Sequence, residues 1–212
     1  MSQAPSYIDQ FEIASKNIDV AIKYLAGKGY STLNNALLGL LSEARRENNR
    51  LLTSLDDLTL TSLSVRNLFE IYLISKHIYS DEKALLNWYG QSHKDSKDIN
   101  DGFISLLKKK GLDTTELESI QKSEDDSLKN SPFESKGGFQ MRHLSEKYGY
   151  LDDYLFIYKL SSKLVHPSSM KIMTYDVLTE NTNYFGIVHQ IGVYFSQEFS
   201  IFLQEVLKQQ TR

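Results

Sequence analysis

Two segments of the sequence carry ionisable side chains at spacings that place them together on one face of a helix. In the first segment, Arg66 and Glu70 are four residues apart, and His77 falls close to Arg66 on a helical wheel. Residues at these spacings share one stripe of a helix. Because the surrounding residues are strongly apolar, this stripe would hold a desolvated ion pair able to keep a site together. The alternative is an ordinary pair on the exposed edge of the helix, which contributes on the order of a few tenths of a kcal/mol.

The second segment runs from Tyr158 to Ser168 and contains Lys159, Ser162 and His166 at positions i, i+3 and i+7. These three side chains line one face of a helix that stops before Pro167, because the residue before a proline is disfavoured in helical geometry. The partial negative charge at a helix C-terminus favours a protonated histidine. Such a face could bind a phosphate or transfer a proton. The alternative is a histidine that only caps the last turn, with the lysines in water.

Several kinds of functional site are excluded by missing motifs. The chain has no cysteine, which excludes disulfides, zinc sites with thiolate ligands and cysteine nucleophiles. Neither Glu-x-x-His nor His-Glu-x-x-His occurs, nor do the glycine motifs of nucleotide-binding folds or the Gly-x-Ser-x-Gly elbow of hydrolases. Residues 27–32 superficially resemble a phosphate loop, but they lack its first glycine and its preceding strand. We therefore expect neither a metal nor a cofactor.

Length and composition indicate how many domains the protein has, what it can bind and where it is located. The chain has 212 residues, for which one domain is the default, and a formal net charge of -3. This charge argues against binding nucleic acid by bulk electrostatics but leaves room for a local basic patch. The absence of cysteine favours a cytoplasmic location. We expect no signal peptide at residues 1–10 and no membrane span, since no stretch of 18 residues is apolar and uncharged.

Apolar residues recur at helical spacing, and there are only three prolines. The sequence therefore predicts an all-α fold, a single-domain bundle of about six to eight helices. The expected helices cover residues 6–26, 31–55, 58–79, 80–110, 114–131, 152–165 and 184–208. The helix at 58–79 is apolar on all sides and should lie in the middle of the bundle.

Three expectations concern the detail of these helices. Residues 43–50 are heavily charged and should form a solvated stretch of the second helix. The helix at 80–110 is expected to break near residues 90–101. Residues 131–140, which contain Pro132 and two glycines, should form a loop. We expect one domain over residues 1–212, with residues 90–140 as the candidate position of an insertion.

The two segments resemble a known kind of protein. Arg66 to Tyr72 resembles the Arg-x-x-x-Glu helix of a bacterial family of helical domains of unknown function, and Ser162, His166 and Ser168 match a later Ser-x-x-x-His-x-Ser segment. That family is similar to the HEPN superfamily (higher eukaryotes and prokaryotes nucleotide-binding). Its members are helical bundles, often dimers, and many are metal-independent ribonucleases of toxin–antitoxin and antiviral defence systems.

The resemblance implies a HEPN-like fold, with RNA and a second copy or another protein as partners. This sequence differs from the superfamily at one position of the nuclease signature. The nuclease signature there is an arginine followed within a turn or two by histidine, whereas here Lys159 precedes His166. Lysine is a point charge and cannot bind phosphate through two parallel hydrogen bonds. Some proteins of this kind are inactive partners or scaffolds.

Two hypotheses follow. In the first, the protein is a HEPN-like ribonuclease with no metal. His166 would act as general base or acid on the ribose 2′-hydroxyl, while Arg66 or Lys159 would stabilise charge on the phosphorane. Glu70 would orient Arg66, and Ser162 would position the phosphate. In the second, the protein is a non-catalytic interaction or oligomerisation module whose apolar C-terminal helix packs against a partner or its own copy. Core packing explains that helix equally well.

Overall fold

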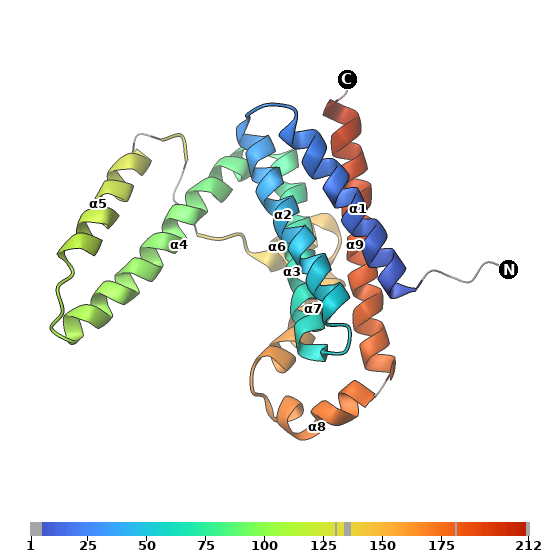
Figure 1. Cartoon of the computed structure of the whole chain (residues 1–212). Coiled ribbons are helices and arrows are strands. Elements are labelled where there is room, and N and C mark those ends of the chain that lie inside the picture. The colour runs from blue at the N-terminus through green and yellow to red at the C-terminus, as the bar shows by residue number, and fades with distance from the viewer. Residues whose placement is uncertain (1–5, 130, 134–136, 181, 211–212) are drawn as a thin grey trace. The chain divides into compact units, whose positions relative to one another are not determined.

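The computed structural model describes residues 6–129, 131–133, 137–180 and 182–210, and every regular element in these ranges is an α-helix (Figure 1). The helices are α1 (Tyr7–Ala26), α2 (Thr32–Thr53), α3 (Leu58–Ser80), α4 (Glu82–Lys109), α5 (Thr115–Lys129), α6 (Met141–Tyr148), α7 (Leu151–Val165), α8 (Ser169–Glu180) and α9 (Thr182–Gln210). The predicted all-α class is confirmed. The described residues form nine helices rather than six to eight, because the short helices α6 and α8 were not expected.

Serine side chains begin the first two helices. The Ser6 hydroxyl accepts a hydrogen bond from the backbone N–H of Asp9, whose carboxylate accepts one from the backbone N–H of Ser6. At α2, Ser31 Oγ accepts from the backbone N–H of Asn34 at 3.1 Å. Each bond satisfies an N–H group that has no partner within its helix. Between the two helices Gly29 has a φ of 82°, a conformation that glycine adopts without strain.

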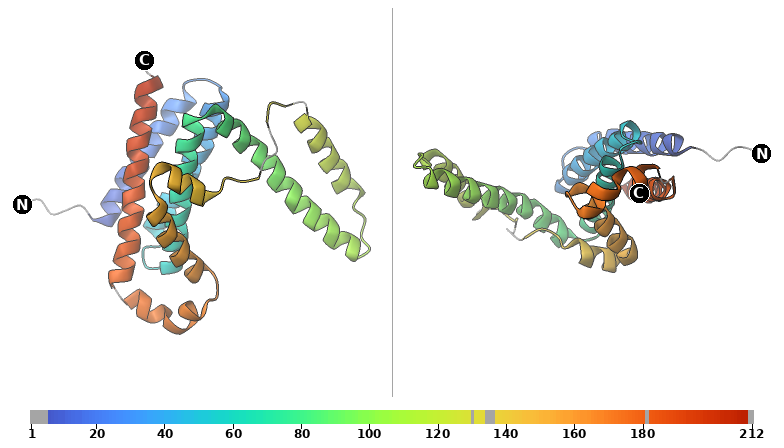
Figure 2. Two further views of the ribbon diagram at one scale, coloured as in Figure 1. Left: turned by 180° about the vertical axis from the view of Figure 1, so that it is seen from behind. Right: turned by 90° about the horizontal axis from the view of Figure 1, so that it is seen from below.

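The chain divides into two compact units (Figure 2). The first unit contains residues 1–76 and 141–212, and the second contains residues 77–140. The expected position of an insertion, residues 90–140, lies inside the second unit. In the first unit α1 runs beside both α2 and α9 (Figures 1 and 2).

An aromatic cluster joins α3 to α9 in the core of the first unit. The Phe69 and Phe195 ring centroids are 4.7 Å apart, and Tyr72 lies edge-on to Phe199. The apolar helix predicted at 58–79 therefore contributes a large share of this core. Gly192 of α9 also belongs to it, since a Cβ at this position would lie 3.0 Å from Val65 Cγ2. This glycine serves close packing within the chain.

The charged middle of α2 is not the solvated stretch that we expected. The Glu47 side chain is 1% exposed, and its Oε1 accepts a hydrogen bond from Asn67 Nδ2 at 2.9 Å as well as an ion pair from Arg50. The neighbouring Asn48 is fully buried and accepts a hydrogen bond from Ser196 Oγ at 3.1 Å. Arg46, Asn49 and Arg50 are exposed as expected. The expectation was wrong for Glu47 and Asn48, because they find partners on α3 and α9, which the local sequence does not reveal.

The second unit consists mainly of α4 and α5. The predicted break in α4 near residues 90–101 is wrong, because the helix continues without interruption to Lys109. An ion pair between Lys94 and Asp98, four residues apart, supports the helix in this stretch. Between the two helices, Lys97 Nζ lies 2.8 Å from Asp125 Oδ2. Polar contacts thus help to join α4 to α5.

Candidate functional site

Arg66 and Glu70 form an ion pair on α3. Arg66 Nε lies 2.9 Å from Glu70 Oε1, and the two side chains are 31% and 27% exposed. The pair is therefore neither buried in the bundle nor free in water. It occupies the edge of α3 that faces α7.

Tyr158 of α7 completes this pair. Its hydroxyl donates a hydrogen bond to Glu70 Oε1, and the Arg66 guanidinium lies over its ring, with Cζ 4.0 Å from the ring centroid. The Tyr154 ring packs against the Tyr158 ring at 4.2 Å between centroids. A cation over an aromatic face is attracted by the ring quadrupole. Arg66 is thus fixed by both a carboxylate and an aromatic ring.

Glu70 raises the pKa values of both Arg66 and Tyr158. Burial disfavours the charge of Arg66, but the hydrogen bond and negative charge of Glu70 outweigh it and raise the pKa of the guanidinium. Burial also raises the pKa of the Tyr158 phenol, and the hydrogen bond and charge of Glu70 raise it further. At neutral pH the cluster therefore contains a charged arginine and a neutral phenol.

The other predicted residues lie on the exposed face of α7. Lys159, Ser162, Lys163 and His166 are all exposed, and the backbone N–H of His166 donates to the Ser162 carbonyl at 3.4 Å as the last bond of the helix. Within the described residues, the side-chain nitrogens of Lys159, Lys163 and His166 make no ion pair or hydrogen bond. This face therefore presents positive charge to solvent. We refer to these four residues as the α7 basic face.

Arg66 and His166 do not touch. The Arg66 side chain contacts Glu70 and Tyr158, and His166 follows Tyr158 by eight residues, which is about 12 Å along a helix axis. A hydrogen bond of 3.5 Å from Thr59 Oγ1 to the Leu164 carbonyl lies between the start of α3 and the end of α7. The ion pair and the imidazole therefore lie at different levels along α7.

Two further residues singled out from the sequence have other contacts. Ser168 Oγ accepts from the backbone N–H of Lys171 at 3.1 Å and donates to the Lys163 carbonyl at 2.6 Å, so it joins the end of α7 to the start of α8. His77 packs edge-on against Phe139, with ring centroids 5.1 Å apart, in the second unit. Neither contact places these side chains beside the Arg66 pair.

The remaining histidines differ from His166. His189 is buried, which lowers its pKa, although a hydrogen bond with the Leu55 backbone opposes the shift. His93 Nε2 lies 2.9 Å from Asp125 Oδ1 in the second unit. His143 on α6 is exposed, as is His166. His143 and His166 are thus both exposed imidazoles with cationic residues on their own helices, and His166 is the one whose helix also contains Tyr158, the partner of the Arg66 pair.

A second polar cluster was not found from the sequence. Glu198 Oε2 accepts hydrogen bonds from Tyr150 at 2.7 Å and from Tyr72 at 3.2 Å, and Lys76 Nζ donates to the Tyr72 hydroxyl at 3.3 Å. Burial raises the pKa of Tyr72 to about 12. The Lys76 ammonium also lies 5.4 Å from the ring centroid of Tyr148. The cluster combines α3, residues 148–150 and α9, which are far apart in the chain, so no local signal marks it.

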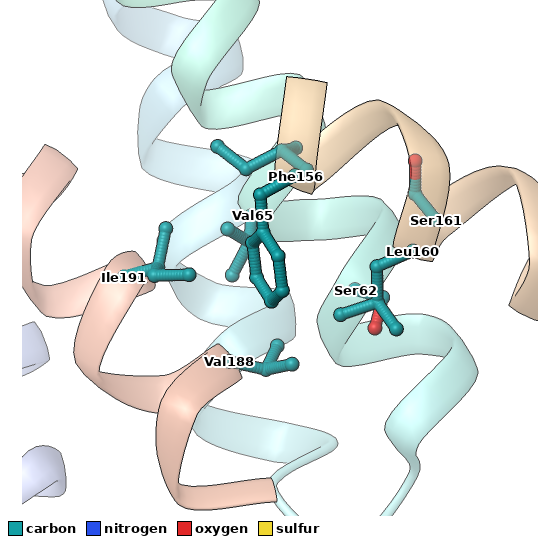
Figure 3. Close-up of a pocket in the computed structure, with 8 residues that line it drawn as sticks. Ser62, Val65, Phe156, Leu160, Ser161, Val188 and Ile191 are labelled. Atoms are coloured by element: carbon teal, nitrogen blue, oxygen red, sulfur yellow. The ribbon is translucent and has the colours of Figure 1, made fainter. Parts of the chain in front are cut away.

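In the part of the chain that the structure describes, the pocket between α3, α7 and α9 is too small for a ligand, and the acidic and histidine side chains form no metal site. The pocket lies between α3, α7 and α9, where Phe156, Val188 and Ile191 converge on Val65 (Figure 3). Its volume is about 10 Å³, which holds a single water at most. In the described part of the chain, no three His, Asp or Glu side chains gather to hold a metal ion. Within the same residues, no helix combines the length and apolarity needed to cross a bilayer.

Residues 52–184 match a family of unknown function, DUF5677. This match covers more than half of the 212 residues. The chain belongs to this family. No curated protein and no solved structure matches the chain. The DUF5677 segment contains the Arg66 pair, Tyr158 and the α7 basic face, whereas α1 and most of α9 lie outside it.

Proposed function

We propose that this DUF5677 protein is a HEPN-like, metal-independent ribonuclease, whose site is the surface formed by the Arg66 pair and the α7 basic face. One observation carries the proposal. A half-exposed arginine, fixed by Glu70 and Tyr158, lies on the same pair of helices as an exposed imidazole with two exposed lysines. Cations position an RNA backbone, and an imidazole can transfer protons near neutral pH.

In this proposal His166 removes the proton from a ribose 2′-hydroxyl, and the resulting oxygen attacks the adjacent phosphorus. The bond to the 5′ oxygen breaks, this oxygen takes up a proton from solvent, and a 2′,3′-cyclic phosphate remains. Negative charge on the phosphorane is stabilised by nearby cations. No metal is required for these steps.

The distances along α7 assign the cations to different phosphates. Ser162 and Lys163 are four and three residues before His166, about one turn, so they are the candidate residues of α7 nearest to the reacting phosphate. Lys159 lies one turn further back. Arg66 is further still from His166, and it would bind the backbone of a neighbouring nucleotide while Glu70 orients it. Lys163 therefore joins the candidate residues.

The test is incubation of the purified protein with RNA in the presence of EDTA. We expect the wild type to cleave RNA, and His166→Ala to lose at least about 100-fold in rate, the scale of general acid–base catalysis. The matched control is His143→Ala, which removes an exposed histidine from α6 and should leave the rate unchanged. Absence of cleavage by the wild type, or equal cleavage by the two variants, would refute the ribonuclease proposal.

A second candidate function is a non-catalytic interaction or oligomerisation module. The observation that favours it is a set of large apolar side chains that α9 exposes to solvent, namely Ile187, Tyr194 and Ile201. Exposed apolar side chains gathered on one face commonly mark an interaction surface. A protein that leaves RNA intact in EDTA but associates stably through α9 would favour this function.

A further inference from the structure

The C-terminal helix α9 has two apolar faces. One face contains Phe195 and Phe199, which are fully buried in the core of the first unit. The other contains Ile187, Tyr194 and Ile201, which are 42%, 41% and 53% exposed. Core packing within the chain explains the first face only.

The exposed residues follow a seven-residue spacing. Such spacing keeps side chains along one seam when two helices wind around each other in a left-handed coiled coil. Three glutamines repeat with the same period and are exposed beside this seam, namely Gln190, Gln197 and Gln204. An apolar seam with a polar border is the pattern of a helix that pairs with another helix.

The seam is symmetric about Tyr194, because Ile187 and Ile201 lie seven residues to either side of it. A twofold axis through Tyr194 would therefore bring Ile187 of one copy against Ile201 of the other, in an antiparallel pair. The same axis brings the Gln190 amide near the Glu198 carboxylate of the other copy, whose Oε1 is not used by Tyr72 or Tyr150. A twofold interface must be complementary to itself, and this seam is.

The apolar surface continues from α9 onto α7. Phe156 is 40% exposed and lies beside Ile191 at the pocket between the two helices (Figure 3). The pair of helices thus offers a wider surface than one seam alone. A wider apolar surface is needed for a stable association, since small contacts rarely give one.

We propose that two copies of this chain associate through α9 in antiparallel orientation, with Tyr194 on the twofold axis and Ile187 of each copy against Ile201 of the other. This gives the interaction module a partner and an orientation. It does not depend on the ribonuclease proposal, because none of the residues of the α7 basic face takes part.

Single cysteines test the orientation, because the natural chain has none. Under oxidation, Tyr194→Cys should form a disulfide-linked dimer, since residues on the axis face each other. Ile187→Cys alone should not, because the two positions would be about 21 Å apart along the helices, but it should cross-link when mixed with Ile201→Cys. Val20→Cys on α1, where the natural valine is 59% exposed, is the control and should stay uncross-linked.

Three results would overturn the proposal. A parallel pair would cross-link Ile187→Cys with itself, and non-specific collision would cross-link Val20→Cys as efficiently as Tyr194→Cys. Light scattering on the wild type would overturn it by finding only monomer at micromolar concentration. We expect a dimer there, converted to a folded monomer by Ile201→Glu and unchanged by Val20→Glu, with helicity checked by circular dichroism. RNA cleavage is measured in a separate assay, so the dimer proposal and the ribonuclease proposal can each fail independently of the other.

Discussion

The hydroxyl of Tyr158 on α7 donates a hydrogen bond to the Glu70 carboxylate on α3, and its ring lies directly against the Arg66 guanidinium. This contact joins two segments that are 88 residues apart in the chain. It brings together the two stretches whose spacing suggested chemistry, and it does so through a residue that neither pattern singled out. The ion pair is therefore part of a helix–helix contact.

Removing the Tyr158 hydroxyl should weaken that contact. Tyr158→Phe keeps the ring under Arg66 but leaves Glu70 with one donor fewer. We expect the free energy of unfolding to fall by about 1 kcal/mol, the usual net contribution of a hydrogen bond. Chemical denaturation measures the change. Tyr154→Phe is the matched control on the same helix and should stay close to wild type.

The Glu198 cluster should make stability sensitive to alkaline pH. The pKa of Tyr72 rises from 10.0 to about 12 on folding, so the folded state holds this proton more tightly than the unfolded state. The contribution of the Tyr72 phenol to the free energy of unfolding is fully present below pH 10 and is lost as pH rises toward 12. Denaturation curves at increasing pH should therefore show a decline in stability that is smaller in Tyr72→Phe. Tyr30→Phe, at a position that is 88% exposed, should decline as the wild type does.

Close packing at Gly192 leads to a prediction about core volume. A methyl group there would meet Val65 Cγ2 at 3.0 Å and Phe11 Cζ at 3.2 Å. Gly192→Ala should therefore lower the free energy of unfolding by about 1–3 kcal/mol through overpacking. Gly39→Ala on α2 meets no atom within 4 Å and should raise it by up to about 1 kcal/mol, because alanine favours helix. An equal change in unfolding free energy for Gly192→Ala and Gly39→Ala would show that α9 does not pack tightly against Val65 and Phe11.

Glu47 offers a comparison between a buried and an exposed carboxylate. Glu47→Ala leaves Asn67 and Arg50 without their shared acceptor, and we expect a loss of about 2–4 kcal/mol in unfolding free energy. Glu12→Ala removes an exposed partner of Lys16 and should cost less than about 0.5 kcal/mol. Thermal or chemical denaturation of both variants would check this. A loss below 1 kcal/mol for Glu47→Ala would mean that water takes the place of the Glu47 carboxylate as the acceptor for Asn67 and Arg50.

The helices themselves could be predicted well from the sequence. Serine caps and apolar periodicity set the bounds of α1 and α2 to within a few residues, because these signals are local. The short helix α8 was missed because only Leu178 of its residues is buried, which leaves little periodicity to detect. The continuity of α4 was also missed, since Gly90 in its sequence is typical of a helix end.

The candidate site was only partly predictable. The Arg66–Glu70 pair follows from four-residue spacing within one helix. The partner Tyr158 and the buried Glu47 depend instead on which helices lie side by side, and spacing along the chain carries no such information. Lys159 was preferred over Lys163 because it takes the place of the superfamily's arginine before the histidine, although Lys163 is nearer to His166 along α7.

Binding of an RNA that cannot be cleaved, because its 2′-hydroxyls are methylated, tests the central claim most directly. The measurement is affinity at several salt concentrations for the double variant Lys159→Ala/Lys163→Ala. Its control, Lys16→Ala/Lys23→Ala, removes the same charge from exposed positions of α1. We expect the α7 variant to bind at least about tenfold more weakly than the control. The slope of its log affinity against log salt concentration should be shallower by about 1.4, which corresponds to the loss of two phosphate contacts. Equal affinity of the two variants would contradict the account.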